Sequence, residues 1–115
     1  MADGREISLY TIDNGTVSAS FTDLGAVWVS MMVPDRNGDL ADVLLGYDDA
    51  EGYLVNGPHF GSIVGRIANR TGGASFTLNG TSYVLGKNKG ESNLHSGPEY
   101  YDRRLWAARE VGEDS

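Results

Sequence analysis

The sequence predicts an all-β fold, and three observations support that prediction. Glycine is abundant, with 16 copies among 115 residues, whereas proline occurs only 3 times. Short apolar runs are separated by turn signals, most clearly the Asn-Gly dipeptides at residues 14–15, 37–38 and 79–80. A helical pattern occurs only once and is brief. Many short strands joined by tight turns explain this pattern better than long helices do.

The first half of the chain predicts antiparallel strands in succession. Residues 6–12 and 16–21 flank a turn at residues 13–15, and Asn-Gly tolerates positive φ, so we expect a hairpin with a type I′-like turn. Residues 27–33 are almost continuously apolar, which is typical of a strand covered on both faces. After a strong proline-containing turn, residues 43–45 are expected to return as another strand.

The second half predicts one helical turn and a second hairpin. Residues 48–54 begin with acidic side chains, which favour a helix N-terminus, but Gly52 keeps that helix short. Residues 74–78 and 81–85 alternate apolar and polar side chains around Asn79-Gly80. This is the clearest hairpin of the sequence.

The last part of the chain is a long polar loop followed by a strand pattern. Residues 87–101 form the loop, and long loops in compact domains are more often functional than merely connecting. Residues 105–111 predict a final strand that runs into a turn signal, where a hairpin partner would begin. We therefore expect residues 1–115 to form one domain, the N-terminal part of a larger β-rich protein.

Composition and charge argue against several classes of function. The net charge is −7 with no basic run, so we expect neither a nucleic acid nor a membrane as partner. The chain has no cysteine, which excludes a disulfide framework and a thiolate zinc site. The N-terminus has no apolar signal core, so a cytoplasmic location is expected. Only two histidines occur, far apart in the sequence, and no metal site is expected.

Two polar segments are candidates for a ligand site: GRIANR at residues 65–70 and NLHSG at residues 93–97. Guanidinium, amide and imidazole groups can together hydrogen-bond several hydroxyls, as a polyhydroxylated small molecule requires. The residues alone leave simpler alternatives open. The arginines could form weak surface ion pairs, and His95 could be a loop histidine whose ring is satisfied by its neighbours.

Five separated motifs resemble the aldose 1-epimerase (galactose mutarotase) family, and they follow the family's order and spacing. They lie at residues 42–53, 60–70, 76–83, 93–97 and 102–106. The motifs cover nearly the whole chain but only the first part of a typical family member. The resemblance implies the N-terminal portion of an antiparallel β-supersandwich that binds the sugar in an open cleft.

The resemblance also implies a chemistry. Asn69 and Arg70 match a pair that hydrogen-bonds sugar hydroxyls, and His95 matches a histidine that lies against the bound sugar. The family interconverts the α and β anomers of aldohexoses such as galactose and glucose by acid/base ring opening, without a cofactor, because each step is a proton transfer. The acid histidine and the base glutamate would lie beyond Ser115. No catalytic residue is therefore expected in this chain, and the isolated 115 residues are expected to be inactive.

Two positions depart from the family pattern. Ser96 stands where a glycine is usual and could narrow the loop, and His59 stands where an aromatic residue is more common and could alter specificity.

Two other functions remain open. One is a non-catalytic sugar-binding or regulatory relative that keeps Asn69, Arg70 and His95 without the acid/base pair. The other is a structural β-domain.

Overall fold

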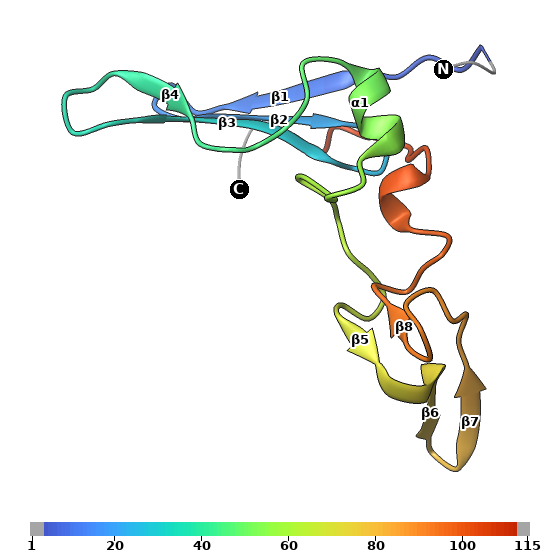
Figure 1. Ribbon diagram of the computed structural model, residues 1–115. Coiled ribbons are helices and arrows are strands. Elements are labelled where there is room, and N and C mark those ends of the chain that lie inside the picture. Colours follow the sequence, from blue (N-terminus) through green and yellow to red (C-terminus); the bar gives the residue numbers. More distant parts are fainter. Residues whose placement is uncertain (1–3, 113–115) are drawn as a thin grey trace.

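The computed structural model describes residues 4–112 and consists mainly of antiparallel strands (Figure 1), which confirms the all-β prediction. Four strands form one sheet in chain order, so that each strand pairs with the next. They are β1 (Leu9–Asp13), β2 (Ser18–Thr22), β3 (Trp28–Pro34) and β4 (Leu40–Asp42). The short helix α1 (Ala50–Val55), expected from its acidic start, lies at one end of this sheet.

The strands β5 to β8 form a second group that extends away from the sheet, whereas the short helix η2 lies beside α1 at the end of the sheet (Figure 1). β5 pairs with β8, and the hairpin of β6 and β7 lies between them in the sequence. The bounds are β5 (Arg70–Thr71), η1 (Gly72–Ala74), β6 (Ser75–Leu78), β7 (Thr81–Val84), β8 (Asn93–Leu94) and η2 (Tyr101–Arg103). The radius of gyration is 17.5 Å. A compact chain of this length would have about 13 Å, so the arrangement is elongated.

The two predicted hairpins form, but only the second has the predicted turn. At the β6–β7 turn, Asn79 and Gly80 have φ values of 50° and 78°, as a type I′ turn requires. The expectation of such a turn after β1 is wrong, because Asn14 is not in the left-handed region. Instead the Asn14 side-chain oxygen accepts the N–H groups of Thr16 and Val17, at 3.0 and 2.9 Å. A longer connection stabilised by a side chain replaces the tight turn.

Two predicted strands do not form in the part of the chain that the structure describes. Residues 43–45 lie beyond the end of β4, where the Asp42 carboxylate accepts the N–H groups of Met31 and Leu44 and takes the place of a ladder partner. Residues 105–111 make a single bridge, between Leu105 and Leu24. Both segments have a suitable apolar pattern, but the first keeps one backbone bond to β3, from the Val43 N–H to the Met31 carbonyl, and the second keeps one bridge. Pattern alone does not reveal where pairing ends.

The core is small and lies where α1 packs against the sheet. Leu24, Val27 and Tyr53 are buried, and the Tyr53 hydroxyl accepts the N–H of Tyr47 at 3.0 Å. β3 is only half-buried, so the expectation that it is covered on both faces is not met within residues 4–112. Within the same range no helix is long and apolar enough to cross a membrane. The anchored helix fixes the start of the loop that follows it, residues 56–62.

Candidate functional site

The pairing of β5 with β8 brings the two predicted polar segments together. Arg70 lies opposite Leu94 and Thr71 opposite Asn93 in an antiparallel register. One residue further along, the backbone N–H of His95 donates to the carbonyl of Asn69 at 2.9 Å. Segments that are well separated in the sequence therefore become adjacent, as a shared binding site requires.

Asn69 and His95 are joined by a second hydrogen bond, and this bond fixes the tautomer of the imidazole. The backbone N–H of Asn69 donates to His95 Nδ1 at 2.9 Å. Since a backbone amide is only a donor there, Nδ1 must be unprotonated, and the neutral ring carries its proton on Nε2. In the neutral ring Nε2 is therefore an N–H donor, a group that can donate to a hydroxyl oxygen.

Three residues of these segments occupy the left-handed region of backbone conformation. The φ values are 63° at Asn69, 54° at His95 and 58° at Ser96. Asparagine and histidine tolerate this region better than most residues, and local strain of this kind clusters at functional sites.

The Ser96 side chain ties its loop to the other polar segment. The Ile67 N–H donates to the Ser96 hydroxyl at 2.9 Å, and the hydroxyl donates to the Ile67 carbonyl at 3.1 Å. Together with the two bonds between Asn69 and His95, these contacts hold the polar segments in one register.

Arg70 is exposed and has a partner within the same segment. Its guanidinium donates to the side-chain oxygen of Asn69 at 3.2 Å. Within residues 4–112 no carboxylate forms an ion pair with Arg70, which disfavours the simpler reading of a surface ion pair. The remaining guanidinium N–H groups are available to hydroxyls.

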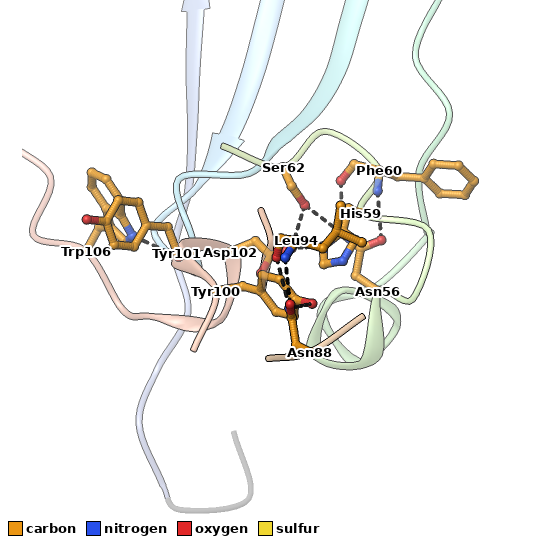
Figure 2. A network of polar contacts seen from close by, with 10 residues as sticks. All are labelled: Asn56, His59, Phe60, Ser62, Asn88, Leu94, Tyr100, Tyr101, Asp102 and Trp106. Carbon is orange, nitrogen blue, oxygen red and sulfur yellow. Dashed lines mark hydrogen bonds and ion pairs between the residues drawn. The ribbon is translucent and has the colours of Figure 1, made fainter. Parts of the chain in front are cut away.

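A second polar cluster adjoins the first, and sequence reasoning missed it. His59 Nδ1 lies 2.6 Å from an oxygen of the buried Asp102 carboxylate, and the Ser62 hydroxyl donates to the same oxygen at 2.7 Å (Figure 2). The rings of His59 and His95 are 6.2 Å apart, and both line one small pocket with Tyr100. Arg70 is not among the residues that line this pocket. His59 and Asp102 are far apart in the sequence, so no local signal pairs them.

The Asn88 side chain stabilises the loop that carries His95 through hydrogen bonds. Its amide nitrogen donates to the Leu94 carbonyl at 2.9 Å and to the Tyr100 hydroxyl at 2.8 Å. Its side-chain oxygen accepts the Leu94 N–H at 2.6 Å. Leu94, the neighbour of His95, is therefore tied through Asn88 to Tyr100, which lies in the segment that carries Asp102 (Figure 2).

The arrangement is that of a β-rich protein with an open cluster of hydrogen-bonding groups suited to hydroxyls. In the described part of the chain, no three His, Asp or Glu side chains are grouped closely enough to hold a metal ion. A sequence model of the aldose 1-epimerase family matches residues 8–115. The chain therefore belongs to the aldose 1-epimerase family.

Individual relatives agree with this assignment. The chain is 40% identical to a probable aldose 1-epimerase of Arthroderma benhamiae, over 99% of this chain and 27% of the relative. It is 37% identical to the galactose mutarotase of Bos taurus, over 90% of this chain and 30% of the relative. The crystal structure of the GalM/aldose epimerase homologue from C. elegans superposes with a TM-score of 0.82 at 28% identity, over 92% of this chain and 33% of that chain. The chain thus spans about a third of the length of these relatives.

Proposed function

We propose that this chain supplies part of the sugar-binding site of an aldose 1-epimerase that acts on aldohexoses such as galactose and glucose in the cytoplasm. The observation that carries the proposal is the double hydrogen bond between Asn69 and His95. It joins the segment that carries Asn69 and Arg70 to the loop that carries His95, and in the neutral His95 ring it leaves the proton on Nε2. Family membership makes a sugar the expected ligand of these groups.

In this proposal the chain binds and orients the sugar, and residues outside it move the protons. Arg70 donates to hydroxyl oxygens that are present equally in the ground state and in the transition state. His95 Nε2–H donates closer to the reacting carbon, where charge develops as the ring opens. No step requires a cofactor, because ring opening and closure consist of proton transfers.

Polarimetry on the complete gene product tests this assignment, with α-glucose and α-galactose as substrates. Arg70→Ala removes ground-state hydrogen bonds to the substrate, so KM should rise about tenfold or more while kcat changes little. Arg36→Ala is a matched control, since Arg36 is exposed in the turn between β3 and β4, outside the site, and should leave both constants unchanged. Unchanged kinetics in Arg70→Ala would show that the residue assignment is wrong.

His95→Ala should lower kcat as well as raise KM, because it removes a donor near the developing charge. The second candidate is a sugar-binding relative without activity, and the observation that favours it is that the matched residues are all binding groups. The same two variants distinguish this candidate from the enzyme. That protein would bind aldohexoses in calorimetry, lose affinity in both variants and produce no change in anomer ratio beyond the uncatalysed rate.

A further inference from the structure

A chain of directed hydrogen bonds leads to His59 (Figure 2). The buried Asn56 donates from its amide nitrogen to the Ser62 hydroxyl at 3.2 Å, and that hydroxyl donates to an oxygen of Asp102 at 2.7 Å. Asn56 is itself oriented by Phe60, whose N–H donates to its side-chain oxygen and whose carbonyl accepts from its nitrogen. The carboxylate oxygen therefore has a fixed position and approaches His59 as an acceptor.

The carboxylate determines which nitrogen of His59 carries the proton. His59 Nδ1 is 2.6 Å from the same Asp102 oxygen, and an ionised carboxylate only accepts. Nδ1 must therefore bear the proton, and Nε2 of the neutral ring is left as an acceptor. This tautomer is the opposite of the one found for His95, whose Nδ1 accepts the Asn69 N–H.

The two imidazoles face a common space. His59 and His95 have ring centroids 6.2 Å apart at an interplanar angle of 64°, and both line the small pocket described above. The Tyr100 ring packs edge-on against His59 at 4.7 Å and restrains its rotation. Asp102 is 3% exposed in its side chain, whereas His59 keeps 25%, so the carboxylate is hidden and the imidazole remains accessible.

We propose that His59 is a further sugar-contacting residue, and that His59 and His95 together recognise one hydroxyl. His95 Nε2–H donates to the hydroxyl oxygen, and the same hydroxyl donates its proton to His59 Nε2. A hydroxyl satisfies both nitrogens because it donates and accepts at once. A fluorine in its place accepts weakly and donates nothing, and a hydrogen does neither. The inference rests on the proposed sugar-binding function and names a determinant of its specificity.

The first measurement is the protonation of the ring nitrogens in the complete gene product, by ¹⁵N-detected NMR at neutral pH. His59 should show the proton on Nδ1 and His95 on Nε2. A proton on Nε2 of neutral His59 would overturn the inference, because the ring would then present a second donor. This measurement needs no substituted protein.

The second measurement is calorimetric affinity for an aldohexose and for its series of monodeoxy and monodeoxyfluoro analogues. At one ring position the unaltered protein should bind the hydroxyl compound about tenfold more tightly than the fluoro compound. His59→Phe, which keeps a ring but no nitrogen, should bind the parent sugar about tenfold more weakly and lose most of that discrimination, because only the His95 donor remains. His59→Asn should behave in the same way while keeping a residue suited to the φ of 61° at this position.

The outcomes separate the two claims. If the unaltered protein binds no aldohexose, the proposed function fails, and this inference fails with it. If it binds aldohexoses but His59→Asn and His59→Phe keep the affinity and the discrimination of the unaltered protein, only the role of His59 is overturned. If neither variant folds, equal affinity of the unaltered protein for hydroxyl and fluoro analogues at every position overturns that role.

Discussion

Ser96 shows how a single side chain can carry opposing effects. Its hydroxyl makes two hydrogen bonds with Ile67, but its φ of 58° is unfavourable for any residue with a Cβ. Ser96→Ala removes the bonds and keeps the strain, so the free energy of unfolding should fall by about 1 kcal/mol. Ser96→Gly removes the bonds and relieves the strain, so its loss should be smaller. Chemical denaturation of both variants measures the difference, and a glycine variant less stable than the alanine variant would contradict this account.

The Asp42 carboxylate makes stability depend on pH in the acid range. The N–H groups of Met31 and Leu44 donate to it and hold its pKa below the ordinary value of 3.8. Because the folded-state pKa is depressed, the stabilisation is fully present above pH 3.8 and is lost as the pH falls through the folded-state value.

Asp42→Asn should therefore weaken the acid dependence of unfolding. Urea titrations at about pH 6 and about pH 2 should give a smaller difference in stability for the variant than for the unaltered protein. Asp39→Asn changes an exposed carboxylate just before β4, at the other end of the strand from Asp42; it is the control and should leave more of the acid dependence in place. If the stability difference between about pH 6 and about pH 2 were the same for Asp42→Asn and the unaltered protein, the Asp42 carboxylate would contribute nothing to the acid dependence.

Among the elements, the loop that carries His59 is fixed to the sheet at Gly61. The Trp28 N–H donates to the Gly61 carbonyl at 2.9 Å, and Gly61 has a φ of 61°. A Cβ built on Gly61 would lie 1.9 Å from the Trp28 carbonyl oxygen, whereas one on Gly57 in the same loop would meet nothing within 4 Å. The loop therefore reaches its position only because residue 61 has no side chain.

Gly61→Ala should displace this loop from β3 and destabilise the protein by about 2–4 kcal/mol. Sugar affinity should fall as well, because His59 and Ser62 move with the loop. Gly57→Ala is the matched control and should stay within about 0.5 kcal/mol of the unaltered protein. Thermal melts and calorimetric titrations of the two variants provide the comparison, and equal stability of both would refute the packing argument.

The β6–β7 hairpin and helix α1 were predictable from local signals, whereas the Asn14-Gly15 turn was not, although it carries the same dipeptide as the β6–β7 turn. Contacts that depend on distant partners were not predictable either. The β6–β7 hairpin carries its own turn, and the stacked rings of Phe76 and Tyr83, 5.1 Å apart, follow from the alternation. The strand pattern after Leu105 was misleading because no partner strand lies beside it within residues 4–112. The contact between His59 and Asp102 joins two loops and depends on tertiary packing, which no spacing rule encodes.

The candidate site was partly predictable from sequence. It consists of Asn69, Arg70 and His95. Their side-chain chemistry suggested a ligand site and the family resemblance assigned each residue a role, but only the β5–β8 register supplies the proximity that spacing could not. Their contact with a sugar stays a prediction.

At the scale of the whole molecule, the core is small for the apolar surface that the chain carries. Leu9, Ile12, Leu40 and Val84 are more than half exposed, and only four hydrophobic residues of the described part are buried. We expect the isolated 115 residues to unfold at low temperature in a broad transition, to bind hydrophobic dyes, and to show no anomerase activity in polarimetry. Differential scanning calorimetry tests the first point. A cooperative melt of a monomer at high temperature would contradict it.

The left-handed backbone at Asn69 and His95 has a practical consequence for redesign of substrate preference. Most substitutions at these two positions would cost stability, about 1–2 kcal/mol each, because few residue types accept that geometry. Directed evolution toward new sugars would do better to hold them constant and diversify Ile63 and Val64, which line the pocket and have no such backbone restriction.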